Sequence, residues 1–173
     1  AQAAAAYGRA GDEARSRQSA RDALAAYSRG AEIASDPRVK LDLTFKAESA
    51  CYVLGARADQ LVWLERAQAL VHALGGEAGR SEAAPELEAE MGLRRALYSW
   101  AVRDLATAER EANRALASKR AIGDRGGEAE SMQVLASIYA LTNRYDEALR
   151  CHLGSLSIGR AIKNPVLEAR GRI

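Results

Sequence analysis

The feature that most limits the fold of this chain is an internal repeat with a period of 40 residues. Residues of one type recur at this spacing, in the sets Ala108 and Ala148, Leu116 and Leu156, Ile122 and Ile162, and Ala89, Ala129 and Ala169. A further copy lies upstream in residues 22–33. A fixed period of this length is typical of proteins in which each repeat packs only on its neighbours. We therefore expect similar units stacked along one direction.

Apolar residues within each repeat follow the period of an α-helix. Leu135, Ile138, Tyr139 and Thr142 fall at positions i, i+3, i+4 and i+7, which is the spacing of one helix face. Two helices in each repeat, with no strand between them, predict antiparallel helical hairpins. The expected helices cover residues 12–34, 38–56, 59–74, 84–101, 104–122, 128–142 and 145–162, with a short helix in residues 1–10.

Proline and glycine residues mark the ends of these helices. Pro37 and Pro165 each follow an Asp or Asn, which is the arrangement of a helix N-terminus. Helix C-termini, where left-handed backbone is needed, are expected at Gly75, Gly76, Gly123, Gly126 and Gly127. We predict one domain over residues 1–173 with hairpins 1–34, 37–75, 84–122 and 128–163, an enlarged loop 75–85, and the start of another helix at 165–173. A domain boundary within that loop is the alternative.

The amino-acid composition argues against a β-rich fold and against a disordered chain. Hydrophobic residues make up 48% and charged residues 28% of the 173 residues, and roughly a fifth are Ala, the best helix former. The 25 basic and 23 acidic residues nearly cancel, so we expect neither a nucleic-acid nor a membrane partner. Cys51 and Cys151 form no paired motif and favour the reducing cytoplasm, with the periplasm as the alternative.

One repeat carries a recognisable pattern in Leu135, Ala136, Tyr139, Asn143, Tyr145, Ala148 and Ser155. These residues resemble the tetratricopeptide repeat (TPR), whose small side chains let neighbouring helices approach closely. The resemblance implies an all-α, right-handed superhelix of stacked antiparallel hairpins, a TPR-like α-solenoid. Residues 122–129 look like the extended inter-repeat segment of the roughly 40-residue variant found in bacterial signalling and regulatory proteins. Helix 84–101 departs from the pattern, because its apolar residues align with those of helix 128–142 at a spacing of 42 residues.

No group of residues has the spacing of a catalytic or cofactor site. The glycines at 123–127 are not followed by Lys and then Ser or Thr, so they form no phosphate loop. His72 and His152 lie in different hairpins without the spacing of zinc ligands. Cys151 precedes His152, but adjacent residues on a helix point about 100° apart and do not face each other. We therefore predict a protein that is not an enzyme and that uses no cofactor or metal.

Partner contacts are expected on the first helix of each hairpin, because this helix lines the concave groove in tetratricopeptide-repeat proteins. The middle hairpins add a basic and aromatic cluster that suits an acidic peptide or a nucleic-acid strand, although such folds more often use it for protein contacts: Arg94, Arg95, Tyr98 and Trp100. An ordinary solvated helix face is the alternative for this cluster. The candidate partner-binding residues are Tyr52, Arg94, Arg95, Leu97, Trp100, Glu130, Gln133 and Ser137.

The leading prediction is a non-catalytic protein- or peptide-binding scaffold that forms the regulatory or sensory part of a larger bacterial signalling or transcription protein. The alternative is a regulator that binds a peptide or small ligand and switches the conformation of the superhelix. The last hairpin should also turn Leu149, Leu153, Leu156 or Ile158 toward a missing neighbour. We expect self-association to cover this C-terminal edge, or the edge to fray.

Overall fold

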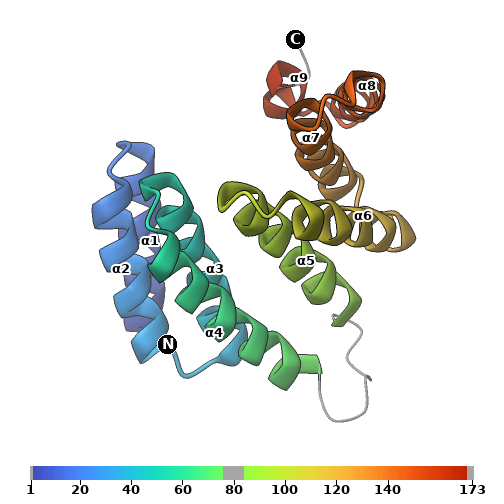
Figure 1. Ribbon diagram of the computed structural model, residues 1–173. Coiled ribbons are helices and arrows are strands. Elements are labelled where there is room, and N and C mark those ends of the chain that lie inside the picture. Colours follow the sequence, from blue (N-terminus) through green and yellow to red (C-terminus); the bar gives the residue numbers. More distant parts are fainter. Residues whose placement is uncertain (1, 76–83, 171–173) are drawn as a thin grey trace. The chain divides into compact units, whose positions relative to one another are not determined.

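The computed structural model describes residues 2–75 and 84–170, and its regular elements there are all α-helices. The helices in Figure 1 are α1 (Gln2–Ser16), α2 (Ala20–Ile33), α3 (Pro37–Leu54), α4 (Arg57–Gly75), α5 (Ala84–Ala101), α6 (Leu105–Ala121), α7 (Arg125–Leu141), α8 (Tyr145–Ala161) and α9 (Pro165–Arg170). They form two compact units, Ala1–Ala84 (unit 1) and Pro85–Ile173 (unit 2), in which successive helices pack together. The predicted all-α, solenoid-like repeat fold is confirmed. Most of the predicted loop 75–85, and residues 171–173 of the predicted last helix, lie outside the described residues.

Unit 2 repeats one helix and one turn every 20 residues. α6, α7 and α8 are each 17 residues long, and their first residues are 20 apart. The turn before each helix contains one residue with left-handed backbone, at Arg103, Gly123, Asn143 and Lys163. The following residue donates its N–H to the carbonyl five residues earlier, as from Asp124 to Lys119 at 2.9 Å. The 40-residue period of the sequence therefore contains two copies of one helix–turn element.

Unit 1 uses the same turn inside each of its hairpins. Gln18 joins α1 to α2 and Gly55 joins α3 to α4, both with left-handed backbone. The next residue again donates its N–H to the carbonyl five residues earlier, from Ser19 to Ala14 and from Ala56 to Cys51. The expectation of one helix over 12–34 was wrong, because this turn interrupts it at residues 17–19.

The segment 122–129 is not an extended linker, which corrects the sequence prediction. The turn is short and α7 begins at Arg125, so Gly126 and Gly127 lie in the first turn of a helix rather than after the end of one. The Asp124 side chain causes this early start, because its carboxylate accepts the backbone N–H of Gly127 at 2.8 Å. The expected spacing of 42 was also wrong, since α5 and α7 end 40 residues apart.

Small side chains fill the places where helices of unit 2 cross. Ala108, Ala112 and Ala115 of α6 are buried in one cluster with Leu135 and Ile138 of α7. The small residues that the repeat pattern singled out are buried as expected: Ala136, Ala148 and Ser155. Because these side chains are small, the helices can pack closely together, as the predicted pattern requires.

The core of unit 1 is centred on one aromatic residue. Tyr27 of α2 is buried against Gly11 of α1, where any added Cβ atom would overlap the tyrosine ring. Its hydroxyl donates a hydrogen bond to Asp12 at 2.8 Å, and Asp12 also pairs with Lys46 of α3 at 3.1 Å. Cys51 of α3 is buried in the same cluster, as the sequence predicted. Three helices are thus tied together around Tyr27.

Candidate binding surfaces

The predicted site residues occupy three helices. Tyr52 belongs to α3 in unit 1, whereas the other candidates belong to α5 and α7 in unit 2. The 20-residue period shows which of them are equivalent. Leu97 of α5 and Ser137 of α7 are 40 residues apart and hold the same helix position, as do Trp100 and Ala140. Arg95 is exposed, although its counterpart Leu135 is buried, and it points to a different side of α5 from Leu97, two residues later.

The three candidates on α7 differ in exposure. Glu130 is exposed, and Gln133 and Ser137 are half-buried. The Ser137 hydroxyl donates to the backbone carbonyl of Gln133 at 3.1 Å. The Nε2 atom of Gln133 is buried and has no hydrogen-bond partner among the described residues. A buried donor without a partner costs free energy in the folded state.

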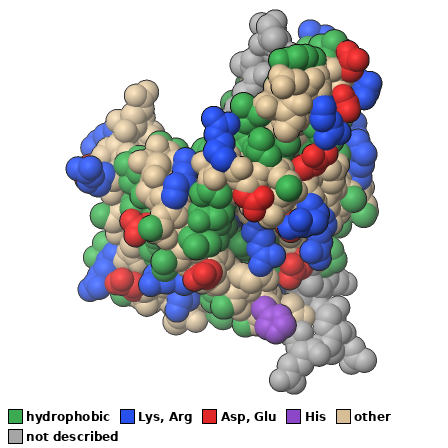
Figure 2. All heavy atoms as spheres, viewed as in Figure 1, with side chains coloured by type: hydrophobic (Ala, Val, Ile, Leu, Met, Phe, Trp, Pro, Cys, Tyr) green, Lys and Arg blue, Asp and Glu red, His purple; other side chains and the backbone are tan. Residues whose placement is uncertain are grey.

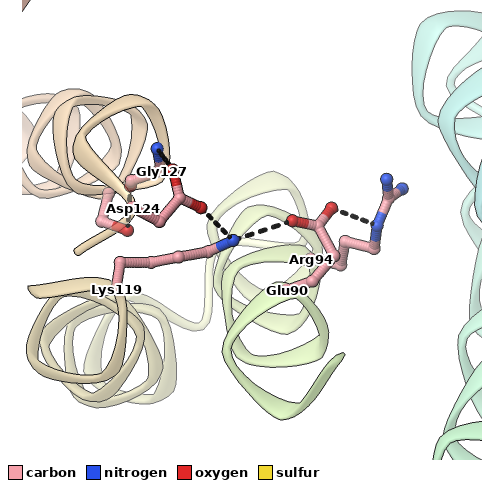
Figure 3. A network of polar contacts seen from close by, with 6 residues as sticks. Glu90, Arg94, Lys119, Asp124 and Gly127 are labelled. Atoms are coloured by element: carbon pink, nitrogen blue, oxygen red, sulfur yellow. Dashed lines mark hydrogen bonds and ion pairs between the residues drawn. The ribbon is translucent and has the colours of Figure 1, made fainter. Parts of the chain in front are cut away.

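Arg94 on α5 is held in a network that joins three helices, shown in Figure 3. Its Nε atom pairs with Glu90 at 2.8 Å, and Glu90 also accepts from Lys119 of α6 at 3.3 Å. Lys119 is only 5% exposed and reaches on to Asp124 at 2.8 Å. Burying an ammonium group is tolerated only when it is paired in this way. Arg94 therefore pairs within α5 with the carboxylate that connects α5 to Lys119 of α6.

The contacts within this network favour the charged forms of Lys119 and Asp124. Burial acts to lower the pKa of Lys119, but its hydrogen bond to Asp124 and the charge of Glu90 outweigh burial and raise it. Burial acts to raise the pKa of Asp124, but the hydrogen bond and charge of Lys119 and the backbone N–H groups of Gly127 and Gly126 together hold the pKa below its ordinary value. Both groups are consequently charged across the neutral range.

Arg95 lies exposed beside a small cleft between α5 and α6. The cleft has a volume of about 60 Å³, and its charged lining consists of Glu88, Arg95, Glu111 and Arg114. Two acidic and two basic side chains leave no excess of either charge there. The space is too small for a ligand-sized group, since ligand pockets usually measure about 300–1,000 Å³.

Leu97 and Trp100 pack partly into the core of unit 2. Both are half-buried against the cluster that includes Ala108 and Ile138. The Nε1 atom of Trp100 is buried and has no hydrogen-bond partner in the described ranges. In unit 1, Tyr52 is half-buried, and the guanidinium of Arg57 lies 4.9 Å from the centre of its ring. The candidates of unit 2 therefore lie at several places on α5 and α7, and Tyr52 belongs to unit 1.

The residues that were weighed for chemistry show no activated group. Burial raises the pKa of Cys151 and lowers the pKa of His152. Neutral thiol and neutral imidazole are thereby favoured, which is the opposite of a thiolate–imidazolium pair. Within the described ranges, no group of three or more His, Cys, Asp or Glu could hold a metal ion.

A groove in unit 1 was missed by the sequence analysis. It has a volume of about 520 Å³ and is lined by the end of α2, the first half of α3 and residues 63–70 of α4. Trp63 and Arg66 form part of its wall, and the guanidinium lies 4.7 Å from the centre of the indole ring. Their spacing of three residues on one helix was a usable signal for that contact. No residue spacing indicated that α2 and α3 complete the groove.

The visible face of the molecule carries basic and acidic side chains intermixed with hydrophobic ones, as Figure 2 shows. No helix in the described part of the chain is long and apolar enough to cross a membrane. The chain matches no protein-family model, and no curated protein matches it. The resemblance to tetratricopeptide repeats stays a prediction.

Proposed function

We propose that this chain is a non-catalytic scaffold of the tetratricopeptide-repeat kind that binds a protein or peptide. In this proposal it serves as the regulatory or sensory part of a larger bacterial signalling or transcription protein. One observation carries the binding role: α8 exposes Tyr145, Leu149 and Leu153, which are 65%, 49% and 55% exposed. These side chains are four residues apart and form one apolar stripe along the helix, the α8 stripe. Contiguous exposed apolar side chains mark interaction sites.

The equivalent helix one repeat earlier, α6, has polar residues on the corresponding face. Glu109 of α6 lies 40 residues before Leu149 and therefore holds the equivalent position. It pairs at 2.8 Å with Arg144, which stands at the N-terminus of α8. The guanidinium of Arg144 also lies 4.2 Å from the centre of the Tyr139 ring of α7. Arg144 thus contacts this side of α6 through polar groups, while Asn113, the counterpart of Leu153, is exposed.

The occupant that fits the α8 stripe is an amphipathic helix. A linear row of apolar side chains at four-residue spacing matches the apolar face of a second helix. The apolar character is specific to α8, because α6 has Glu109 and Asn113 where α8 has Leu149 and Leu153. Polar residues there suit contacts within the chain, and leucines suit a separate partner.

The test is a selection of helical peptides from a displayed library against the whole chain, followed by calorimetry. We expect the selected peptides to carry an apolar face and to lose binding to the double variant Leu149→Asp, Leu153→Asp. The matched control is Val53→Asp with Val62→Asp, two exposed apolar residues of unit 1. Peptides that bind both double variants equally well, or a selection without binders, would contradict the proposal. Arg95→Ala with Trp100→Ala measures the contribution of α5 in the same assay.

A further inference from the structure

The groove of unit 1 combines an apolar floor with positive charge. Its lining includes Thr44, Trp63 and Leu70, together with the charged residues Glu32, Lys40 and Arg66. Trp63 is 8% exposed and lines the groove. The volume of about 520 Å³ is within the usual range of ligand pockets and exceeds that of a single side chain.

The charges of the groove do not cancel. Glu32 is already paired with Arg29 at 3.0 Å. Lys40 and Arg66, in contrast, have no acidic partner among the described residues. They come from different helices, α3 and α4, and both line the same space. A pair of uncompensated cations beside an apolar surface favours a ligand that carries a carboxylate.

Arg66 is prepared for such a contact by its neighbour. Its guanidinium lies 4.7 Å from the centre of the Trp63 ring, so one flat side of the group is covered. A stacked guanidinium keeps its N–H donors at the edge, where they can reach a carboxylate. The stack also reduces the conformational freedom that Arg66 would lose when a ligand binds.

We infer that the groove binds an acidic peptide segment in which a carboxylate side chain lies next to an apolar one. The carboxylate is held between Lys40 and Arg66, and the apolar side chain packs on Trp63 and Leu70. This inference rests on the proposed scaffold function and gives the chemical class of a peptide bound by unit 1. It concerns a surface distinct from the α8 stripe.

Trp63 allows binding to be measured directly. The chain has two tryptophans, so Trp100→Phe leaves Trp63 as the single reporter. The probe is acetyl-Gly-Phe-Glu-Gly-amide, and its counterpart with Gln in place of Glu tests the charge. We expect a saturable change in Trp63 emission with the Glu peptide. Affinity for the Gln peptide should be about tenfold lower, as expected for the loss of a charge-assisted contact.

Substitutions of the basic groove residues test which of them bind the carboxylate of the peptide. In the Trp100→Phe background, Lys40→Gln should weaken binding of the Glu peptide by about tenfold, whereas Arg21→Gln should leave it unchanged. Arg21 is an exposed residue at the start of α2, far along the helix from the groove. Arg66→Gln, followed by calorimetry because the substitution alters the environment of Trp63, should weaken binding similarly. Raised salt concentration should also weaken binding.

Two controls make failure informative. 3-Phenylpropionate carries the same carboxylate and aromatic group without a peptide backbone, and binding as tight as that of the peptide would overturn the peptide assignment. Equal binding of the Glu and Gln peptides, or no binding of either, would overturn the inference as a whole. The double variant Leu149→Asp, Leu153→Asp should leave the Trp63 titration unchanged. Failure in the groove with intact binding at the α8 stripe would contradict this inference alone.

Discussion

Asp104 and Asp124 occupy equivalent positions in successive turns, but their side chains make different contacts. Both carboxylates accept a backbone N–H at the start of a helix, from Thr107 at 3.1 Å and from Gly127 at 2.8 Å. Only Asp124 also pairs with the buried Lys119. We expect Asp124→Asn to lower the free energy of unfolding by about 1–3 kcal/mol, because it turns an amide toward a buried ammonium.

The matched variant Asp104→Asn should change stability by less than about 0.5 kcal/mol, since Asn caps a helix as well as Asp does. Urea unfolding at neutral pH measures both. The contribution of Asp124 should also depend on pH. Its pKa is lowered in the folded state, so its stabilisation is present above the ordinary Asp range and is lost as pH falls through the folded pKa. Equal effects of the two Asn variants would contradict a role for the ion pair.

Tyr27 should make the stability of the chain fall at alkaline pH. Burial, followed by the hydrogen bond to Asp12, raises the pKa of Tyr27 to about 12. In the unfolded chain a tyrosine loses its proton near pH 10. Between these values the folded state binds more protons, so the free energy of unfolding decreases as pH rises. Tyr27→Phe should reduce this decrease, as measured by urea unfolding at several pH values. A slope unchanged by the substitution would contradict the assignment.

At the scale of the element, the turn between helices requires one residue with left-handed backbone, and this residue is glycine in some turns but not in others. Gly123 adopts its left-handed conformation without strain, whereas Arg103 adopts the same conformation with a side chain, at φ 68°. Arg103→Gly should therefore raise the free energy of unfolding by about 0.5–1 kcal/mol, and Gly123→Ala should lower it by about 1 kcal/mol. Arg103→Ala is the control, because it removes the guanidinium and retains the Cβ atom. A gain from Ala equal to that from Gly would show that backbone strain is not the cause.

The elements also show what the sequence could and could not predict. Helices and buried small residues such as Ala148 were predictable, because apolar spacing and repeat position report on burial directly. The turn at Gln18 was not, because Arg17, Gln18 and Ser19 carry neither Gly nor Pro to mark a break. Gly127, in contrast, wrongly suggested a helix C-terminus, although it lies in the first turn of α7. Its place inside a helix depends on a cap from Asp124 and on contact with Lys119.

Sites that depend on several helices lay beyond the sequence. The groove of unit 1 needs Lys40 of α3 and Arg66 of α4 to line one space, and residue spacing does not report such contacts. Arg94 appeared available in the sequence, yet Glu90 engages it. Residue type and helix position could therefore predict a binding role in general terms. Which side chains remain free was decided by packing between helices.

At the scale of the whole molecule, the C-terminal edge was predicted to be an uncovered apolar surface. The structure corrects one part of that prediction: Ile158 is buried with Leu167, because α9 packs over it. Leu156 is half-buried. Leu149 and Leu153 are exposed as expected, and Tyr145 extends the same row. The uncovered surface is therefore the α8 stripe rather than the whole edge.

A second copy of the chain can cover this stripe, since two identical apolar helices are mutually complementary about a twofold axis. We expect weak self-association, seen as a sedimentation coefficient that rises with protein concentration in the micromolar range. Leu149→Asp with Leu153→Asp should abolish the rise, because dimer formation would then bury like charges. Val53→Asp with Val62→Asp, on exposed residues of unit 1, should leave it unchanged. A sedimentation coefficient independent of concentration would assign the stripe to a different protein, and a rise that persists in the α8 variant would place the contact elsewhere.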